Sequence, residues 1–288
     1  MAYLHIPNLY KSQDILLFKE CYASEKIHGT SAHIKWKNKK INFFSGGTNH
    51  EKFVQLFNTN NLIFKFQELG HPEIIIYGEA YGGKCQGMSK TYGAKDRFVA
   101  FEVKIGNLWL DILNAEKIVR SFDLDFVPYE KCSTDLKILD ELRDKPSQQA
   151  IKCGIIEIPK KREGIVLRPL IEVTKNNGER IICKHKAEDF QETKTPRKVS
   201  SKNLVILAEA NAIAIEWVTE MRLTHVLQKF PNADIEDTGN IIKFMIEDIE
   251  REAEGEIVTS KAARKAISRE TAIMFKTRLK NSLLLNRK

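Results

Sequence analysis

The chain has 288 residues, 42% of them hydrophobic, which is enough to bury one large core or two smaller ones. Its formal charge of +8 is concentrated at one end: residues 261–288 hold nine basic residues and one acidic residue, and the remainder holds 37 of each. Such a basic run favours a phosphate-bearing partner, although a solvated helix face would also explain it. The longest apolar stretch, 204–218, is interrupted by polar residues, which excludes it as a membrane span.

Cysteine usage and the N-terminal pattern indicate a reducing compartment. The five cysteines are odd in number, lie far apart and form no C-x-x-C pair, so neither a zinc site nor a disulfide framework is expected. The N-terminus lacks the charged-then-apolar pattern of a secretory signal. We therefore expect a cytoplasmic protein, or a viral protein that acts in the host cytoplasm.

The first two-thirds of the chain predicts short strands joined by turns. Three hairpins are expected where two alternating runs flank a turn: 32–36 with 40–44, 97–103 with 107–112, and 164–169 with 180–184 around an Asn-Gly turn at 176–178. A further strand is expected at 73–77, and helices at 51–69 and 115–122. Antiparallel hairpins with helices outside them define an α+β fold.

The pattern changes beyond residue 187. Residues 187–203 are polar, charged and broken by Pro196, and no strand signals follow. Apolar residues at helical spacing instead predict three helices, at 204–230, 239–252 and 260–285. The sequence therefore predicts a first domain at 1–195, a linker at 196–203 and a small all-helical domain at 204–288.

Lys26 is the candidate nucleophile. It lies in the string Glu25-Lys26-Ile27-His28-Gly29-Thr30, where a glycine three residues later allows backbone to approach a phosphate. A lysine can take a nucleotide onto its side-chain nitrogen when neighbouring positive charge or a metal helps to release its proton. A K-x-x-G string occurs about once by chance in a chain this long. Four others begin at Lys84, Lys90, Lys161 and Lys175, so Lys26 stands out only if a nucleotide pocket follows.

Four later strings supply the other parts of such a pocket. Attack on the α-phosphate of a nucleoside triphosphate also needs a carboxylate for ribose or metal, a flat apolar surface for the base and cations for the phosphates. In chain order these are Gly78-Glu79, Phe101-Glu102, Glu163-Gly164 and Lys184-His185-Lys186. Strand alternation places both lysines of the last string on one face, and places Glu102 opposite Phe101. Each string alone has an ordinary structural explanation, but their ordered occurrence favours the pocket.

These five strings resemble the five nucleotidyltransferase motifs of the covalent polynucleotide ligases. The first string, E-K-I-H-G-T, resembles the form found in the RNA ligase 2 family. The resemblance covers roughly residues 20–190 and implies an antiparallel-sheet adenylyltransferase domain followed by a small helical domain. It further implies an ATP-dependent RNA ligase that joins a 5′-phosphate end of RNA to a 3′-hydroxyl end, with ATP and Mg²⁺ or Mn²⁺ as cofactors. The expected partner is a nicked RNA duplex, and the expected state is a monomer.

The resemblance also implies a role for each residue of the pocket. Lys26 would be the adenylated nucleophile, and Lys184 and Lys186 would hold the AMP phosphate. The remaining implied nucleotide contacts are Glu25 with the adenine amino group, His28 with the leaving pyrophosphate, Glu79 with the ribose, Phe101 stacked on the adenine, and Ile27 and Gly29 beside them. Glu163 would engage the lysine or a metal-bound water. Arg264, Lys265 and Lys276 of the basic tail are expected to contact RNA.

Two positions depart from the family pattern, and three alternatives stay open. Phe44 stands where an arginine is usual, and Arg168 where a lysine is common, which leaves the substrate preference open. A GTP-dependent capping-type guanylyltransferase or a DNA ligase would use the same lysine chemistry, but these enzymes usually end in an oligonucleotide-binding barrel. A non-catalytic RNA-binding protein that retains the pocket is the third alternative.

Overall fold

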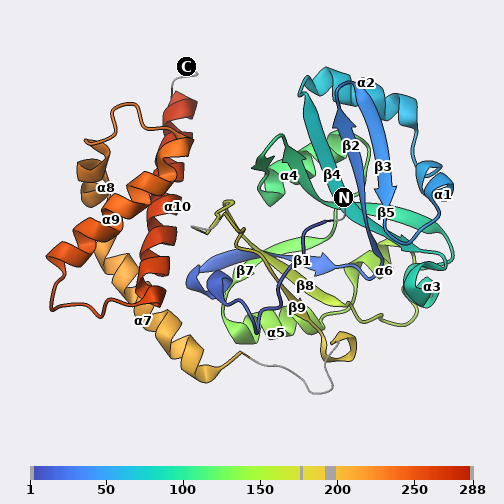
Figure 1. Ribbon diagram of the computed structural model, residues 1–288. Helices are drawn as coiled ribbons and strands as arrows, with labels where there is room; N and C mark the ends of the chain where they lie inside the picture. Colours follow the sequence, from blue (N-terminus) through green and yellow to red (C-terminus); the bar gives the residue numbers. More distant parts are fainter. Residues whose placement is uncertain (1–2, 176–177, 192–198, 286–288) are drawn as a thin grey trace. The chain divides into compact units, whose positions relative to one another are not determined.

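The computed structural model describes residues 3–175, 178–191 and 199–285, and it divides into two compact units (Figure 1). Of the described residues, the first unit comprises 3–172 with 182–191, and the second comprises 173–175, 178–181 and 199–285. Residues 173–175 and 178–181 therefore group with the helical unit, although the sequence placed them in the first domain. Residues 176–177 of the predicted turn and 196–198 of the predicted linker lie outside the described residues.

The first unit contains two antiparallel sheets, as the α+β prediction requires. One sheet has the order β3-β2-β4-β5-β6, and the other the order β7-β1-β8-β9. The strands of the five-stranded sheet are β2 (Thr30–Lys37), β3 (Lys40–Ser45), β4 (Glu73–Gly82), β5 (Asp96–Ile105) and β6 (Leu108–Trp109). The strands of the four-stranded sheet are β1 (Glu20–Lys26), β7 (Tyr129–Ser133), β8 (Gly164–Pro169) and β9 (Cys183–Lys186). Isoleucines at alternate positions of β4, Ile74 and Ile76, are fully buried and anchor the core.

Most of the predicted strands are confirmed, with two corrections at their ends. The hairpin of β2 and β3 and the antiparallel pairing of β8 with β9 are present. The strand expected at 107–112 is only two residues long, because helix α4 begins at Ile112 with Asp111 as its cap. The strand expected from residue 180 begins at Cys183, and Arg180 lies before it in an isolated bridge with Thr174.

Short helices surround the sheets. They are α1 (His50–Val54), α2 (Thr59–Leu69), α3 (Ser89–Tyr92), α4 (Ile112–Ser121), α5 (Leu136–Asp144) and α6 (Gln148–Lys152), with 3₁₀ turns at Asp14–Leu17, Cys85–Gly87 and Glu188–Phe190. The single helix expected at 51–69 is wrong: the chain leaves the helix after α1, and the Asn58 side chain accepts a hydrogen bond from the Asn61 N–H to start α2. Helices α5 and α6 were not predicted from the sequence.

The second unit is helical, as predicted. Its helices are α7 (Ser201–Trp217), α8 (Glu220–Leu227), α9 (Thr238–Glu252) and α10 (Lys261–Leu285), with a 3₁₀ turn at Ile235–Asp237. The helix expected at 204–230 is two helices, because Val218 is extended and Thr219 caps α8. Helix α7 begins within the predicted linker, so residues 201–203 are helical. In the described part of the chain, no helix is long and apolar enough to cross a membrane.

Candidate functional site

Lys26 lies at the end of β1, a strand that is paired on both sides. Its neighbours are β7 and β8, and the residue opposite Lys26 in β8 is Gly164. The Lys26 Nζ atom lies 2.8 Å from Oε2 of Glu163, a residue 137 positions later in the chain. A strand held from both sides keeps this amine in a defined position.

Glu163 gathers three basic side chains around one carboxylate. Besides Lys26, the Nδ1 atom of His28 lies 3.3 Å from Oε2, and the Nζ atom of Lys186 lies 3.1 Å from Oε1. The Glu163 side chain is only 4% exposed. Burial opposes its ionisation, but the hydrogen bonds and charges of His28, Lys26 and Lys186 outweigh burial and lower the pKa of Glu163 to about 2. The carboxylate is therefore charged, and it links the predicted first, fourth and fifth strings.

Strand register aligns the basic residues. Lys26 is paired with Gly164, and Gly164 with Lys186, so the two lysines lie in one row across three strands. Lys184, two residues earlier in β9, projects from the same face as Lys186. Gly164 has φ +150°, and a Cβ atom added to it would lie 2.2 Å from the carbonyl oxygen of His185. Only glycine fits between these strands, which explains the Glu-Gly order of the fourth string.

Gly29 brings the first string against β4. A Cβ atom added to Gly29 would lie 2.3 Å from the carbonyl oxygen of Ala80. The Gly29 backbone is hydrogen-bonded to Glu79, and Glu79 also interacts electrostatically with Lys26 and Glu163. Burial raises the pKa of Glu79 to about 7, with these neighbouring groups as smaller influences. The second string therefore lies beside the first, as predicted.

A cavity of about 390 Å³ opens beside Lys26 within the first unit. Its walls combine cationic side chains with apolar and aromatic side chains, a composition that suits a nucleotide. The lining residues include Lys26, Lys184 and Arg168 as cations, Glu25, Glu79 and Glu102 as carboxylates, and Ile27, Phe101, Val127 and Val166 as apolar surface. Cavities of this volume are large enough to hold small ligands.

Phe101 reaches this cavity through a β-bulge. Tyr77 pairs with Glu102 and Gly78 with Ala100, so Phe101 is an extra residue in β5. The predicted alternation is therefore wrong at this point, and Phe101 and Glu102 both line the cavity. A bulge beside a site commonly re-aims one side chain, and here it turns an aromatic ring toward the cavity.

Glu25 lines the cavity, but its carboxylate is bound to the start of α6. It accepts hydrogen bonds from the Ser147 hydroxyl, from the Gln148 N–H at 2.8 Å and from the Gln149 N–H at 3.2 Å. Burial raises the pKa of Glu25, and the hydrogen bond from Ser147 opposes that shift. The described hydrogen bonds of Glu25 are thus all to groups of the protein, and its contact with adenine stays a prediction.

The N-terminal segment completes the cavity wall, which the sequence did not indicate. Residues 3–6 line the cavity, and the Tyr3 ring packs edge-on against Phe101 at 4.9 Å between centroids. The next residues pair with the outer edge of β9. The Lys184 N–H donates a hydrogen bond to the Pro7 carbonyl, and the Lys184 carbonyl accepts one from the Leu9 N–H. No hydrophobic periodicity marks these residues as part of a site.

The two departures from the family pattern have different structural consequences. Phe44 stacks on His33, with ring centroids 5.0 Å apart, and burial lowers the pKa of His33 to about 4. This pair supplies no cation. Arg168 is buried and forms an ion pair with Glu102 at 3.1 Å, which joins β8 of one sheet to β5 of the other. Arg168 thus links the two sheets at the cavity wall.

The structure places the predicted metal and RNA contacts at different sites. Among the described residues, no group of three or more His, Cys, Asp or Glu side chains could hold a metal ion. A metal at this site would therefore depend on ligand phosphates and water, with Glu163 as a nearby carboxylate. Arg264, Lys265 and Lys276 lie on α10 in the second unit, where Arg264 is hydrogen-bonded to Glu250.

Comparison with known proteins identifies the family and the fold. The family model for RNA ligase matches residues 19–186, more than half of the chain. No curated protein matches this chain. Solved structures of Naegleria gruberi RNA ligase are similar, including one variant with AMP and Mn (TM-score 0.52), another with ATP and Mn (0.52) and a complex with PPi (0.51). Each is 16% identical and covers 66% of this chain and 57% of its own, so the chain spans less than two thirds of their length.

Proposed function

The chain belongs to the RNA ligase family, and from that membership we propose that it is an ATP-dependent RNA ligase that works through a lysyl-AMP intermediate. The observation that supports this most is the convergence of Lys26, Glu163 and Lys186 beside the cavity. A lone lysine could serve many purposes. Here a buried carboxylate holds the lysine with one oxygen and a second lysine with the other. This arrangement is suited to attack on a phosphate.

The cavity residues fit a nucleotide in one orientation. We assign the base to the apolar end, stacked on Phe101, because this ring is turned into the cavity by the bulge. Glu79 would bind the ribose. Lys184 would hold the α-phosphate together with Lys186. Both lysines of β9 project from the sheet face on which Lys26 lies. Ile27, Gly29 and His28 would close the site around Lys26.

Lys26 would form the first covalent bond of the reaction. Its Nζ atom attacks the α-phosphorus of ATP, the bond to the pyrophosphate oxygen breaks, and AMP remains on the lysine. Glu163 orients the amine through the 2.8 Å contact. With a pKa of about 2, Glu163 is a weak base, so we assign it the orientation of Nζ and not the removal of the amine proton, which leaves to solvent as the N–P bond forms. AMP then passes to a 5′-phosphate of RNA, and a 3′-hydroxyl displaces it to seal the strand.

Mg²⁺ or Mn²⁺ would supply charge neutralisation on the phosphates when bound. Glu163 would contact it through water, since the carboxylate oxygens already receive three basic side chains. We further propose that a nicked RNA duplex is the substrate and that Arg264, Lys265 and Lys276 contact its phosphates. The enzyme would act as a monomer in the cytoplasm.

Covalent labelling tests the proposal. The full chain is incubated with ATP labelled at the α-phosphate and a divalent cation, and acid-stable label on the protein is measured. We expect labelling of the wild type and none of Lys26→Ala. Lys84→Ala is the matched control, because Lys84 begins another K-x-x-G string but is exposed and does not line the cavity.

The outcome separates the proposal from its alternatives. Labelling by GTP in place of ATP would indicate a capping-type guanylyltransferase, and the absence of any label would indicate a binding protein that retains the pocket. If the wild type is labelled, sealing of nicked RNA is compared with sealing of nicked DNA. Sealing of nicked DNA alone would indicate a DNA ligase.

A further inference from the structure

We propose that the segment 136–152, which contains α5, α6 and the loop between them, positions Lys26 at the end of β1, Glu163 directly before β8 and the lysine pair of β9. This segment does not contain any of the five strings, and the proposed reaction assigns it no role. The inference rests on the proposed function, because the reaction measured below is adenylation of Lys26. It gives a positioning role to the Glu25 carboxylate, which binds the start of α6 although Glu25 also lines the cavity, and to the His185 imidazole.

Strand register places two rows of residues on opposite faces of the four-stranded sheet. The row of Lys26, Gly164 and Lys186 faces Glu163, whereas the adjacent row contains Glu25, Ile165 and His185. Adjacent residues of a strand project to opposite sides. Each catalytic lysine therefore has a neighbour in sequence that points away from Glu163, toward whatever packs behind the sheet.

Glu25 is bound to the start of α6. It is 3% exposed and accepts three hydrogen bonds from Ser147, Gln148 and Gln149. A buried carboxylate that lost these donors would bear an uncompensated charge, so the contact is held firmly. Because Glu25 directly precedes Lys26, the end of β1 is fixed to this segment.

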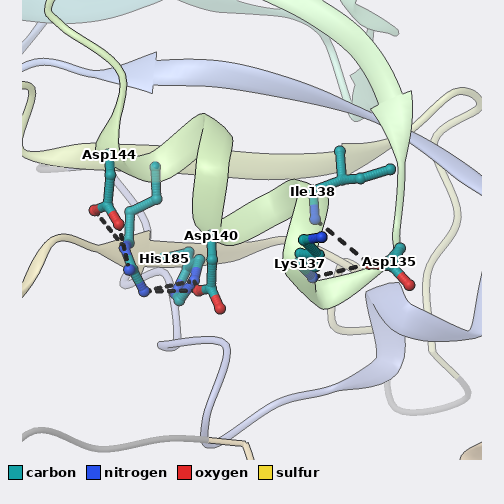
Figure 2. Close-up of polar contacts among 7 residues, drawn as sticks. Asp135, Lys137, Ile138, Asp140, Asp144 and His185 are labelled. Carbon is teal, nitrogen blue, oxygen red and sulfur yellow. Dashed lines mark hydrogen bonds and ion pairs between the residues drawn. The ribbon is translucent and has the colours of Figure 1, made fainter.

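His185 is bound to α5 (Figure 2). Its Nε2 atom lies 2.7 Å from Oδ1 of Asp140, and Arg143 donates to the same oxygen at 2.7 Å. With Nε2 as the donor, the imidazole and Arg143 share one carboxylate. Asp135 begins the helix by accepting hydrogen bonds from the backbone N–H groups of Lys137 and Ile138. His185 lies between Lys184 and Lys186, so its anchor fixes the strand that carries both.

Arg162 forms the third anchor. This buried residue directly precedes Glu163, and its guanidinium donates to the carbonyl of Leu142 at 3.2 Å and to the carbonyl of Pro146 at 2.9 Å. The backbone is also joined here, since the Ser147 N–H donates to the Lys160 carbonyl at 2.7 Å. Three residues adjacent to catalytic positions thus bind one short segment. The segment sets the distances among the catalytic side chains without touching the nucleotide.

Adenylation kinetics of full-length variants test this role. The variants are His185→Ala, His185→Gln and Asp140→Ala, with Glu141→Ala as the matched control. Glu141 lies beside Asp140 on α5, is exposed and has no ion pair within the described chain. Each protein is assayed for the rate constant of lysyl-AMP formation at saturating ATP, for the ATP concentration at half-saturation and for the melting temperature.

We expect His185→Ala and Asp140→Ala to lower the rate constant about 10- to 100-fold, because small misplacements of reacting groups have effects of this size. The half-saturating ATP concentration should change less than threefold. His185→Gln should restore most of the rate, since its amide N–H can reach Asp140, and Glu141→Ala should match the wild type.

Three outcomes would overturn the inference. Wild-type rate constants in His185→Ala and Asp140→Ala would show that the anchor is dispensable. A loss in His185→Gln equal to that in His185→Ala, with a parallel fall in melting temperature, would indicate a purely structural residue. A change confined to ATP half-saturation would indicate a binding role. Failure of the wild type itself to form lysyl-AMP would instead reject the proposed function.

Discussion

Lys26 and Glu163 meet at 2.8 Å although 137 positions separate them in the chain. The contact joins the end of β1 to the entry of β8, two adjacent antiparallel strands. Because the same carboxylate also receives His28 and Lys186, its loss would leave several basic groups without their shared counter-ion. The predictions below begin from this group and extend to the cavity around it.

Glu163→Gln should abolish lysyl-AMP formation and lower the free energy of unfolding at pH 7 by about 3–5 kcal/mol, the range for breaking a buried ion pair. The folded-state pKa of Glu163, about 2, lies below its ordinary value of 4.5. Its stabilisation is therefore present above pH 4.5 and is lost as the pH falls toward 2. Urea unfolding from pH 3 to 7 measures this, with the exposed Glu157→Gln as control. A pH-independent difference between Glu163→Gln and the wild type would contradict the assignment.

Glu79 should produce the opposite pH dependence. Its folded-state pKa of about 7 lies above the ordinary 4.5, so the folded protein favours the protonated carboxyl. Stability relative to Glu79→Gln is then greatest below pH 4.5 and falls as the pH rises to about 7, by up to about 3 kcal/mol. Unfolding free energies of both proteins from pH 4 to 8 test this. Parallel pH curves would show that Glu79 titrates normally.

Gly29→Ala should destabilise the first unit and stop adenylation. The new Cβ atom would lie 2.3 Å from the Ala80 carbonyl oxygen, and the resulting displacement moves the residues next to Lys26. Overpacking of this kind costs about 1–3 kcal/mol. Gly239→Ala, where an added Cβ meets nothing within 4 Å, is the control: it should leave adenylation unchanged and should not destabilise the protein, because alanine favours helix α9 more than glycine does. Unfolding and labelling are measured together, and wild-type labelling of Gly29→Ala would refute the close packing.

Phe101→Ala should weaken ATP binding about 10- to 100-fold, since loss of an aromatic stacking partner costs about 1–3 kcal/mol per base. Phe101→Tyr keeps the ring and should bind ATP within a few-fold of the wild type. Leu108→Ala, an exposed change on the neighbouring strand β6, is the control. The dissociation constant is measured by isothermal titration calorimetry on Lys26→Ala protein, which lacks the proposed nucleophile. Equal affinities for the alanine and tyrosine variants would place the base elsewhere.

Several parts of the fold and site could be read from the sequence because they depend on local patterns. The β2–β3 hairpin follows from strict alternation, and α9 from apolar residues at helical spacing. The resemblance of the five strings to the ligase motifs implied that Lys26, Glu163 and Lys186 share one pocket. Local rules failed where one residue changes the register, as at the bulge that turns Phe101 into the cavity.

Helices α5 and α6 were not predicted, because each is short and the contacts that hold it in place are long-range. Glu25 binds Ser147 across 122 positions, and His185 binds Asp140 across 45. Local signals were present in α5, where Asp135 is the cap and Leu136, Leu139 and Leu142 recur at helical spacing, whereas the five-residue α6 has only its cap, Ser147. The contacts of Tyr3 with Phe101 have no local signal at all.

The central position of β1 has a consequence for how this chain can vary among relatives. Substitutions between residues 20 and 26 change single side chains, but inserting or deleting one residue would exchange the two faces of the strand. Glu25 would then point toward Glu163, and Lys26 toward the start of α6. Length differences among active relatives should therefore fall in the loops, while the distance in sequence between Cys21 and Lys26 stays constant.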